Sequence, residues 1–482
     1  MEKRWTVLTV TTVGIFTSSL DMSLLVVGLP VLLSEFKTDL ALGSWVITVH
    51  RLALVSLLAP IGKLSDIHGR VKLYTIGYFI FAVGALLSAF SPSIYHLMGF
   101  RLIQGIGGAF MFVNSIAMVT DAFADKGLGT GIGINQVAIN AGTVTGYTLS
   151  GVVISLYGWR TLFLIDALVG FLGGLWAKLR LREDFAKINS KNEVKFDWKG
   201  AVTFSTTLLI VLYVLTMGSK MPSQLSALLI VQSMILFSVF VWIEKNTVNP
   251  MIDLKLFKIR TFTIGNFSNF LNGITFASLA LLASLYLEVV EGFTPMQAGL
   301  TLIPLDLTLI IIGPLSGWLS DRIGTRILTT TGLVVSGISL LILSNITLQM
   351  NYILLLTGLI VAGLGVGMFR SPNASSVMGA VPPDYRGVAA GVRSTILNMS
   401  MALSTPFAVA IIYLTTSISD LPLASISSEL TTQMEVLVKN QLTLGIRNTL
   451  IISAIINFIA AIISYLREEE LQKTRVKPSE HL

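Results

Sequence analysis

Long apolar runs recur along nearly the whole chain, and short polar segments carrying most of the charge separate them. Many of the runs approach or exceed the roughly 20 apolar residues that an α-helix needs to cross a bilayer. They are too long, and too little alternating, for the strands of a membrane β-barrel. Because lipid admits only helices and closed barrels as spanning structures, the pattern predicts an all-α membrane protein.

The pattern predicts about fourteen spans, an even number that puts both termini on one side of the membrane. The expected helices lie near 5–33, 43–61, 73–91, 95–120, 128–157, 161–181, 200–217, 223–243, 262–287, 295–319, 327–346, 350–371, 387–415 and 446–466. The longest polar stretches between them are 182–199 and about 416–445. Neither is long enough for a separate domain.

The distribution of Lys and Arg predicts how the chain is oriented. The loops on the side of the termini carry 24 of these residues, and those on the other side carry 5. Since Lys and Arg accumulate in cytoplasmic loops, we expect both termini to be cytoplasmic. The net charge of +7 follows the same loops, so orientation explains it better than a nucleic-acid partner does.

Composition narrows the chemistry. Hydrophobic residues make up 53% of the chain and charged residues 12%, against about 25% charged in soluble domains. There is no cysteine, and the four histidines lie apart without the spacing of metal ligands. We therefore predict no metal and no cofactor. The expected partners are membrane lipid, a small-molecule substrate and protons, and the sequence leaves the oligomeric state open, a monomer included.

Two octapeptides reveal an internal repeat. GKLSDIHG at 62–69 follows the second expected span, GWLSDRIG at 317–324 follows the tenth, and five positions are identical in register. The shared spacing implies a duplicated unit. We predict an N-terminal six-helix half at 1–182, a linker region with two additional spans at 183–261, and a C-terminal six-helix half with a tail at 262–482. A substrate path is then expected between the halves near the membrane midplane.

The first octapeptide, continued to Arg70, resembles the G-x-L-x-D-x-x-G-R signature of the major facilitator superfamily. Three further segments resemble the fourteen-span drug:proton antiporter branch of that family: Leu20 and Asp21 followed by Leu29 and Pro30; Arg101 and Gln104 followed by three glycines; and Trp159, Arg160 and Phe163. The resemblance covers the full length. It implies two six-helix halves plus two extra helices, in a prokaryotic cell membrane.

The chain also departs from that branch. The antiporter signature of span five reads G-x-x-x-G-P-x-x-G-G, whereas this chain has Gly142, Gly146, Tyr147, Ser150 and Gly151 at the corresponding places. The proline and one glycine are missing, which leaves antiport open. Directly after Asp66 of the first octapeptide, this chain has Ile67 where the resembled family usually has arginine.

Seven ionisable residues fall inside the expected spans. At about 3 kcal/mol each, leaving all of them unpaired would cost on the order of 20 kcal/mol, so they must face a cavity or one another. The plainer alternative for several of them is a buried structural pair. They are Asp21, Arg51, Arg101, Asp166, Asp306, Arg370 and Arg393.

The resemblance implicates a membrane-embedded acid and the span-four arginine in proton coupling. We accordingly expect Asp21 to pair with Arg101, and Asp306, between two prolines of span ten, to be the second candidate for proton binding. Arg51, Arg393, Asp166 and Arg370 are the candidate residues of the substrate cavity. Arginine offers forked donors to a carboxylate or phosphate, but the same arginines would equally neutralise the aspartates.

Glycines and the repeated loop suggest the moving parts. Gly62 and Gly69 are expected to permit tight turns, and Asp66 to accept hydrogen bonds from a helix N-terminus or from Arg70. The resemblance implies that this cluster latches a cytoplasmic gate, with Asp321 as the weaker counterpart. Bare helix faces that allow close packing are predicted at Gly105, Gly107, Gly108, Gly142 and Gly146.

These features favour a secondary active transporter. The leading prediction is proton-coupled efflux of small amphipathic organic compounds, of the multidrug type, by alternating access. The alternative is a proton-coupled organic-anion transporter, and a channel or an intramembrane enzyme is a remote third. No catalytic motif, ATP-binding loop or selectivity filter is found, so we predict that the chain is not an enzyme.

Overall fold

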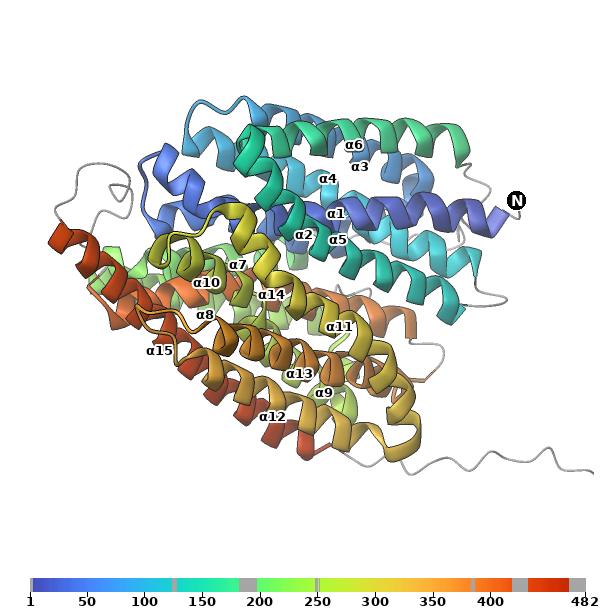
Figure 1. The fold of residues 1–482 in the computed structure, drawn as a ribbon. Coiled ribbons are helices and arrows are strands. Elements are labelled where there is room, and N and C mark those ends of the chain that lie inside the picture. Colours follow the sequence, from blue (N-terminus) through green and yellow to red (C-terminus); the bar gives the residue numbers. More distant parts are fainter. Residues whose placement is uncertain are drawn as a thin grey trace, which may run out of the picture.

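Helices account for almost every residue that the computed structural model describes, namely 3–123, 128–181, 197–247, 250, 252–382, 386–417 and 432–467. Within these ranges, fourteen helical segments are long and apolar enough to cross a membrane. The predicted all-α fold class is therefore confirmed. Figure 1 shows α1 to α6 on one side of the molecule and α9 to α15 on the other.

The first group packs six spans together and is followed by an additional pair. α7 lies against α2 and α14, while α8 contacts chiefly α7 and exposes most of its surface. The helices are α1 (Lys3–Glu35), α2 (Leu40–His68), α3 (Arg70–Ala89), α4 (Ile94–Ala122), α5 (Leu128–Tyr157), α6 (Arg160–Arg180), α7 (Trp198–Met217) and α8 (Ser223–Asn246).

The second group also has six spans, the first of which is interrupted. α9, α10 and a π-helical turn at Tyr286–Val290 follow one another and form that span. The helices are α9 (Arg260–Phe276), α10 (Leu279–Leu285), α11 (Pro295–Ile323), α12 (Thr325–Leu343), α13 (Tyr352–Gly379), α14 (Arg386–Thr415) and α15 (Thr432–Tyr465).

The repeated octapeptides fold in the same way in both groups. The N–H of Gly69 donates to the carbonyl of Ser65 at 3.0 Å, and Gly324 donates to Ser320 at 3.0 Å. Gly69 has a φ of 98° and Gly324 a φ of 91°, a backbone region that favours glycine. The tight turn expected at Gly69 is present. The one expected at Gly62 was wrong, because α2 continues through it to His68.

The last span begins earlier than expected. α15 starts at Thr432 instead of near residue 446, so part of the segment expected as a loop is helical. That part is polar, but Glu435 and Lys439 lie one helical turn apart and form an ion pair of 2.8 Å. Hydropathy defines only the apolar part of such a helix.

The two groups meet most closely along α5 and α11. A Cβ on Gly151 would collide with the carbonyl of Pro295, and one on Gly299 would lie 2.5 Å from the carbonyl of Tyr147. Bare glycine surfaces on both helices therefore let the backbones touch. These contacts belong to the end of the bundle farther from the chain termini, which we call the opposite face. The terminal face is the end where α1 begins and α15 ends.

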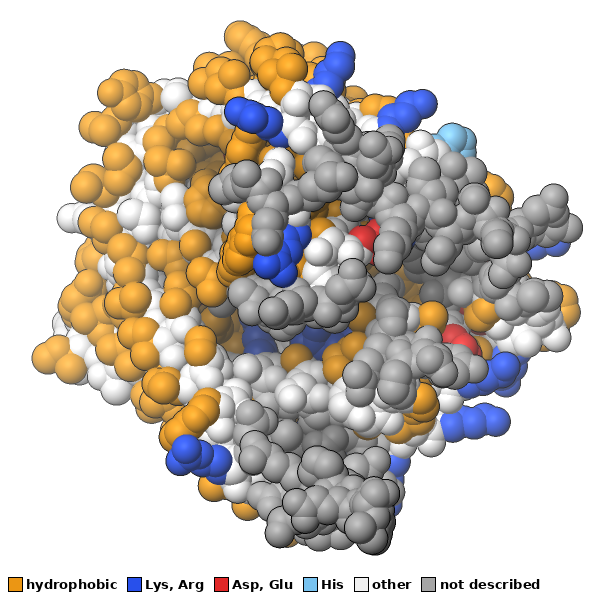
Figure 2. Space-filling model, turned by 90° about the vertical axis from the view of Figure 1, so that its right-hand side faces the viewer, with side chains coloured by type: hydrophobic (Ala, Val, Ile, Leu, Met, Phe, Trp, Pro, Cys, Tyr) orange, Lys and Arg blue, Asp and Glu red, His pale blue; other side chains and the backbone are white. Residues whose placement is uncertain are grey.

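The apolar packing differs between the two faces. A large cluster near the opposite face joins both groups and includes Leu29 of α1, Leu282 of α10 and Leu302 of α11. Near the terminal face, one cluster around Tyr74 stays within the first group and another around Phe369 within the second. A further cluster, with residues from α2, α7, α9 and α14, joins the two groups and extends to this face. Figure 2 looks onto the terminal face and shows a hollow near its middle, with Lys or Arg side chains below the rim.

Polar contacts reinforce the closed opposite face. Lys220, between α7 and α8, pairs with Asp39 at 2.8 Å, and the N–H of Ala41 donates to the hydroxyl of Tyr413 of α14 at 3.2 Å. Burial acts to raise the pKa of Asp39, but hydrogen bonds from Lys220 and from the N–H of Leu42 outweigh it, so the pKa lies below its usual value. The molecule is thus closed at the opposite face and hollowed at the terminal face.

A disulfide cross-link tests this arrangement, since the chain has no cysteine of its own. The N–H of Met296 donates to the Ser155 hydroxyl at 3.3 Å, which brings the two Cα atoms near the separation that a disulfide requires. We expect Ser155→Cys with Met296→Cys to cross-link under mild oxidation, as measured by mass spectrometry of a proteolytic digest.

The matched control combines Ser155→Cys with Leu315→Cys. Leu315 is exposed and lies about 28 Å further along α11 than Met296, at about 1.5 Å per helical residue. Equal cross-linking of both pairs, or none of the first pair, would contradict the observed contact.

Candidate functional site

A buried acid and a buried arginine meet in the first group. Nη1 of Arg101 on α4 lies 2.6 Å from Oδ1 of Asp21 on α1, and both side chains are 1% exposed. Gln104 connects the same two groups: it accepts from Arg101 at 2.8 Å and donates to Asp21 at 2.9 Å. The structure therefore brings together the pair expected for proton coupling.

The shape of α4 explains why this network forms between helices. Arg101 and Gln104 lie three residues apart and so share one face of the helix. On the same stretch, a Cβ on Gly105 would lie 2.6 Å from the carbonyl of His50, so α2 approaches α4 at backbone distance. That approach places Nε2 of His50 3.3 Å from Oδ2 of Asp21, completing a buried set from three helices.

A second carboxyl group joins this set. Asp166 on α6 is 1% exposed, and neither of its oxygens has a hydrogen-bond partner among the described residues. It interacts electrostatically with Asp21 and Arg101 and lies beside Gln104. The structure thus places Asp166 in the first group's network and not with the cavity arginines, where we had expected it. Two carboxyl groups then face one guanidinium, so one proton would balance the charge.

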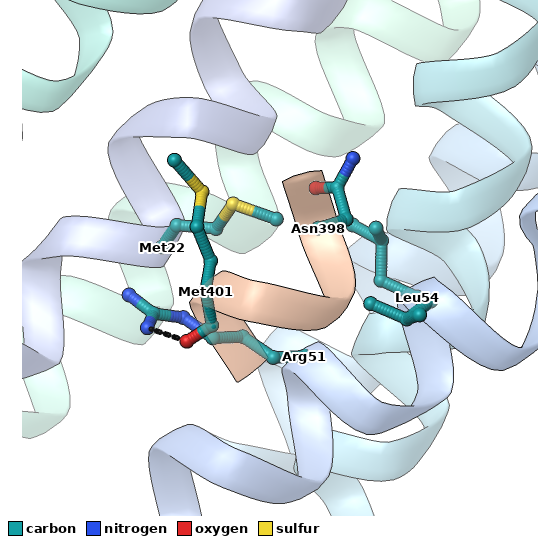
Figure 3. A pocket seen from close by; sticks show the side chains of 6 residues that line it. Met22, Arg51, Leu54, Asn398 and Met401 are labelled. Carbon is teal, nitrogen blue, oxygen red and sulfur yellow. Dashed lines mark hydrogen bonds between the residues drawn. The ribbon is translucent and has the colours of Figure 1, made fainter. Parts of the chain in front are cut away.

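A pocket opens beside this network, between the two groups. Figure 3 shows Met22 of α1, Arg51 and Leu54 of α2, and Asn398 and Met401 of α14 around it. About 250 Å³ in and around it is free of protein atoms, open solvent included. Arg51 donates to the backbone carbonyl of Met401 at 3.0 Å and so joins α2 to α14. Its walls are otherwise largely apolar.

Two more arginines occupy the second group. Arg370 on α13 and Arg393 on α14 are partly exposed, and the Nε atom of each is buried without a hydrogen-bond partner. Arg370 interacts electrostatically with Asp306, Arg393 and Tyr147, and its guanidinium lies 5.4 Å from the centre of the Phe276 ring. Both charges lie in the halves of their helices nearer the terminal face and are not part of the Asp21 network.

Asp306 occupies a different environment from Asp21. It lies on α11 between Pro304 and Pro314, is 9% exposed, and its Oδ2 atom is buried without a hydrogen-bond partner. Arg370 is close enough to attract it, but the two form no ion pair in the described structure. Asp306 therefore keeps a free acceptor in the region of the cavity.

The gating cluster is only partly described. Arg70 forms an ion pair with Asp121 of α4 and donates to the carbonyl of Ala117 at 3.3 Å. The side chains of Asp66 and Asp321 lie outside the described residues, so the expected latch stays a prediction. What the structure shows is that Arg70 ties the start of α3 to the end of α4.

The predicted packing glycines behave differently from one another. A Cβ on Gly142 would lie 2.5 Å from the carbonyl oxygen of Phe16, and one on Gly146 would lie 2.7 Å from the carbonyl oxygen of Leu20. The absence of side chains at these glycines therefore lets α5 pack closely onto α1. Gly107 contacts the backbone of α3 just as closely. A Cβ on Gly108 would meet its nearest neighbours only at 3.8 Å, an ordinary contact, so this position does not require glycine.

Three residues of the site, Gln104, His50 and Tyr147, were not among the candidates predicted from the sequence. Gln104 carried a usable signal, because it lies three residues after Arg101 in a span. His50 and Tyr147 carried less: their neighbours in space come from other helices, which sequence spacing does not reveal. Within the residues that the structure describes, no group of three or more His, Asp or Glu could hold a metal ion.

Comparison with known proteins identifies the fold. The profile of the Major Facilitator Superfamily matches residues 11–405, with a second match at 266–481. The chain belongs to the major facilitator superfamily. The members compared below are transporters, and the repeated turns and the fourteen candidate spans agree with that assignment.

Individual relatives cover most of the chain. It is 30% identical to the riboflavin transporter RibZ of Clostridioides difficile, over 84% of this chain and 88% of that protein. It is 27% identical to the multidrug efflux pump LfrA of Mycolicibacterium smegmatis, over 84% of this chain and 80% of that protein.

Solved structures share the fold at lower sequence identity. A bacterial homolog of the human lysosomal transporter Spinster, in an inward-facing and unoccupied conformation, aligns with a TM-score of 0.70 at 16% identity, covering 97% of each chain. The human organic anion transporter MFSD10 aligns with a TM-score of 0.63 at 16% identity, over 96% of this chain and all of that one.

The charge balance of the Asp21 network predicts an asymmetry in stability. Arg101→Gln leaves two buried carboxyl groups without a cation and is expected to lower the free energy of unfolding by about 3–5 kcal/mol. Asp21→Asn leaves Asp166 to balance Arg101 and is expected to cost much less. In the double variant, Asp21→Asn should restore part of the stability lost with Arg101. Thermal unfolding of the purified protein in one detergent measures all three.

Arg160→Gln is the matched control. Arg160 pairs with Glu35, but its side chain is 44% exposed, so solvent screens the pair and the expected loss is at most about 1 kcal/mol. Strictly additive effects of the Asp21 and Arg101 substitutions would contradict the coupling.

Proposed function

We propose that this transporter exports small amphipathic organic compounds in exchange for protons, by alternating access. The observation that carries the proposal is the buried set of Asp21, Asp166 and Arg101, in which two carboxyl groups share one guanidinium beside His50. With one shared proton such a set is neutral, and without it the set carries one negative charge, so proton uptake removes an uncompensated charge from the membrane. Proton binding and release are thereby linked to the packing of α1, α2, α4 and α6.

The orientation of the chain gives the cycle a direction. The excess of Lys and Arg in the loops at the terminal face supports a cytoplasmic position for that face. The hollow then opens to the cytoplasm, where an exported compound enters, and the closed opposite face must open to release it. Bacterial relatives support a prokaryotic cell membrane as the location.

Geometry explains how the two states interconvert. The contact of α5 with α11 depends on bare glycine surfaces and an apolar cluster, without a buried ion pair across the groups at that point. Two rigid groups can rock about such an interface when a proton or a substrate changes the charge between them. Moving one charge through 100 mV supplies about 2.3 kcal/mol, enough to concentrate a substrate on the far side.

The relatives support export of organic compounds without fixing the substrate. One is named as a multidrug efflux pump and another as a riboflavin transporter. Proton-coupled transport of an organic anion is the second candidate, and a specific observation favours it: Arg51, Arg370 and Arg393 lie within candidate spans and make no ion pair with a described carboxylate.

Proton flux in proteoliposomes tests the proposal. A pH-sensitive dye inside the vesicles reports proton movement when panels of lipophilic cations and organic anions are added. We expect substrate-dependent proton flux in the native chain and its loss in Asp21→Asn, because an amide at this position no longer exchanges a proton.

The matched control is Glu435→Gln, which removes a carboxylate from a partly exposed pair at the opposite face. It should keep the full flux. Proton flux that persists in correctly folded Asp21→Asn would sink the proposed role of Asp21.

Alternating access adds a second expectation. The cross-link between Ser155→Cys and Met296→Cys joins α5 to α11 at the opposite face and should stop transport, whereas reduction with dithiothreitol should restore it. Transport that continues at full rate in completely cross-linked protein would exclude rocking about this contact.

A further inference from the structure

The arginines of the central cavity differ from Arg101 in how their charge is compensated. Arg101 has an aspartate at 2.6 Å and a glutamine at 2.8 Å, and it is 1% exposed. Arg51, Arg370 and Arg393 form no ion pair in the part of the chain that the structure describes. The single hydrogen bond found for Arg51 goes to the carbonyl of Met401.

The local charge balance is therefore positive. Asp306 is the acid that interacts electrostatically with Arg370, and it offsets one of the three cations. Two positive charges then remain within the candidate spans. Since charge in the middle of a membrane is costly, a site of this kind is stabilised by a bound anion.

The donors are available for such a ligand. The Nε atoms of Arg370 and Arg393 are buried and have no hydrogen-bond partner, yet both side chains are partly exposed. The two residues lie on α13 and α14 and interact electrostatically with each other. Two like charges kept together without a shared counterion form a clamp for a group with several acceptor oxygens.

The pocket that Arg51 lines supplies the surfaces for the rest of the ligand. Met22, Leu54 and Met401 present apolar surface, and methionine side chains adapt to ligands of different shape. Asn398 adds one polar group: its amide donates to the carbonyl of Ser394, which leaves the side-chain oxygen as an acceptor. An apolar body with one anionic end fits these surfaces.

We propose that the cavity selects amphipathic organic anions, whose carboxylate or phosphate is held by Arg370 and Arg393 while the apolar body lies against Met22, Leu54 and Met401. This inference rests on the proposed transport function and names its substrate class. Arg51 closes the anionic end from the α2 side. Asp306 limits the excess positive charge, so the clamp binds the anion reversibly and does not trap it.

Binding of three probes with the same ring and different charge tests the selection. They are 1-naphthoate, the neutral 1-naphthylmethanol and the cation 1-naphthylmethylammonium, each titrated calorimetrically against the full chain in lipid nanodiscs. We expect the anion to bind at least tenfold more tightly than the neutral probe, and the cation more weakly than both.

Substitutions locate the selection in the clamp. Arg370→Gln and Arg393→Gln should each lower the affinity for 1-naphthoate by about ten- to hundredfold, the usual loss when a charge-assisted hydrogen bond is removed. Affinity for 1-naphthylmethanol should stay within about twofold. Arg370→Lys should fall between the native chain and Arg370→Gln, because it keeps the charge and loses the fork.

Two further variants separate the possible failures. Arg180→Gln removes an exposed arginine outside the cavity and should change nothing. Asp21→Asn should keep the binding of 1-naphthoate while losing proton flux, so a defect in coupling is distinguished from a defect in recognition. Proton flux that persists in Asp21→Asn would count against the coupling role and leave the substrate class standing.

The inference is overturned if 1-naphthoate binds no more tightly than 1-naphthylmethanol. It is overturned equally if none of the three probes binds. It is also overturned if the affinity for 1-naphthoate is unchanged in both glutamine variants.

Discussion

The cost of placing charge in an apolar medium governs this structure. At about 3 kcal/mol for each ionised side chain at mid-span, such residues need compensation from other groups of the chain or from a ligand. Arg101 illustrates the complete case, with Asp21, Gln104 and the carbonyl of Val46 all within hydrogen-bond distance. Four helices contribute to the site once His50 and Asp166 are included. Compensation of one guanidinium therefore helps to decide how α1, α2, α4 and α6 pack together.

The same constraint separates two kinds of buried charge. In the first group Arg101 is paired with Asp21 and Gln104, whereas Asp166 has no hydrogen-bond partner among the described residues, and one proton would balance the charge. In the second group Arg370 and Arg393 keep unpaired nitrogen atoms, and Asp306 keeps an unpaired oxygen. A set that lacks one proton suits proton exchange, whereas a set with unpaired cations suits an anionic ligand supplied from outside.

The sequence predicted much of this arrangement because its strongest signals are local. Apolar length gave the spans, and the octapeptide spacing gave the repeated turns at Gly69 and Gly324, which have the same hydrogen bond. The pairing of Asp21 with Arg101 followed from the family resemblance, and it agrees with the cost of leaving either charge unpaired in a span. The prediction of helix ends was wrong where helices extend beyond the apolar part of their sequence. Gly62 was expected in a turn and Thr432 in a loop, but both lie in helices.

Contacts between distant segments were harder to predict. Asp166 was expected among the cavity residues, yet the packing of α6 places it beside Asp21. Nothing in the spacing of residues along α6 says which neighbour its carboxyl will meet. Hydropathy treats a buried acid in the same way whether it faces a cavity or another acid, and only the angles between helices separate the two outcomes.

Arg51 links the two kinds of site. It follows His50 directly in α2, so the imidazole turns to Asp21 while the guanidinium turns to the cavity and reaches Met401 of the other group. Arg101 repels it electrostatically, and that repulsion increases when Asp21 carries a proton and no longer neutralises Arg101. In the proposed cycle, a change in protonation in the first group is transmitted, through one residue of α2, to the helix that holds Arg393 and Asn398. The contact between α2 and α14 is then the place where we propose that proton binding and substrate binding act on the same pair of helices.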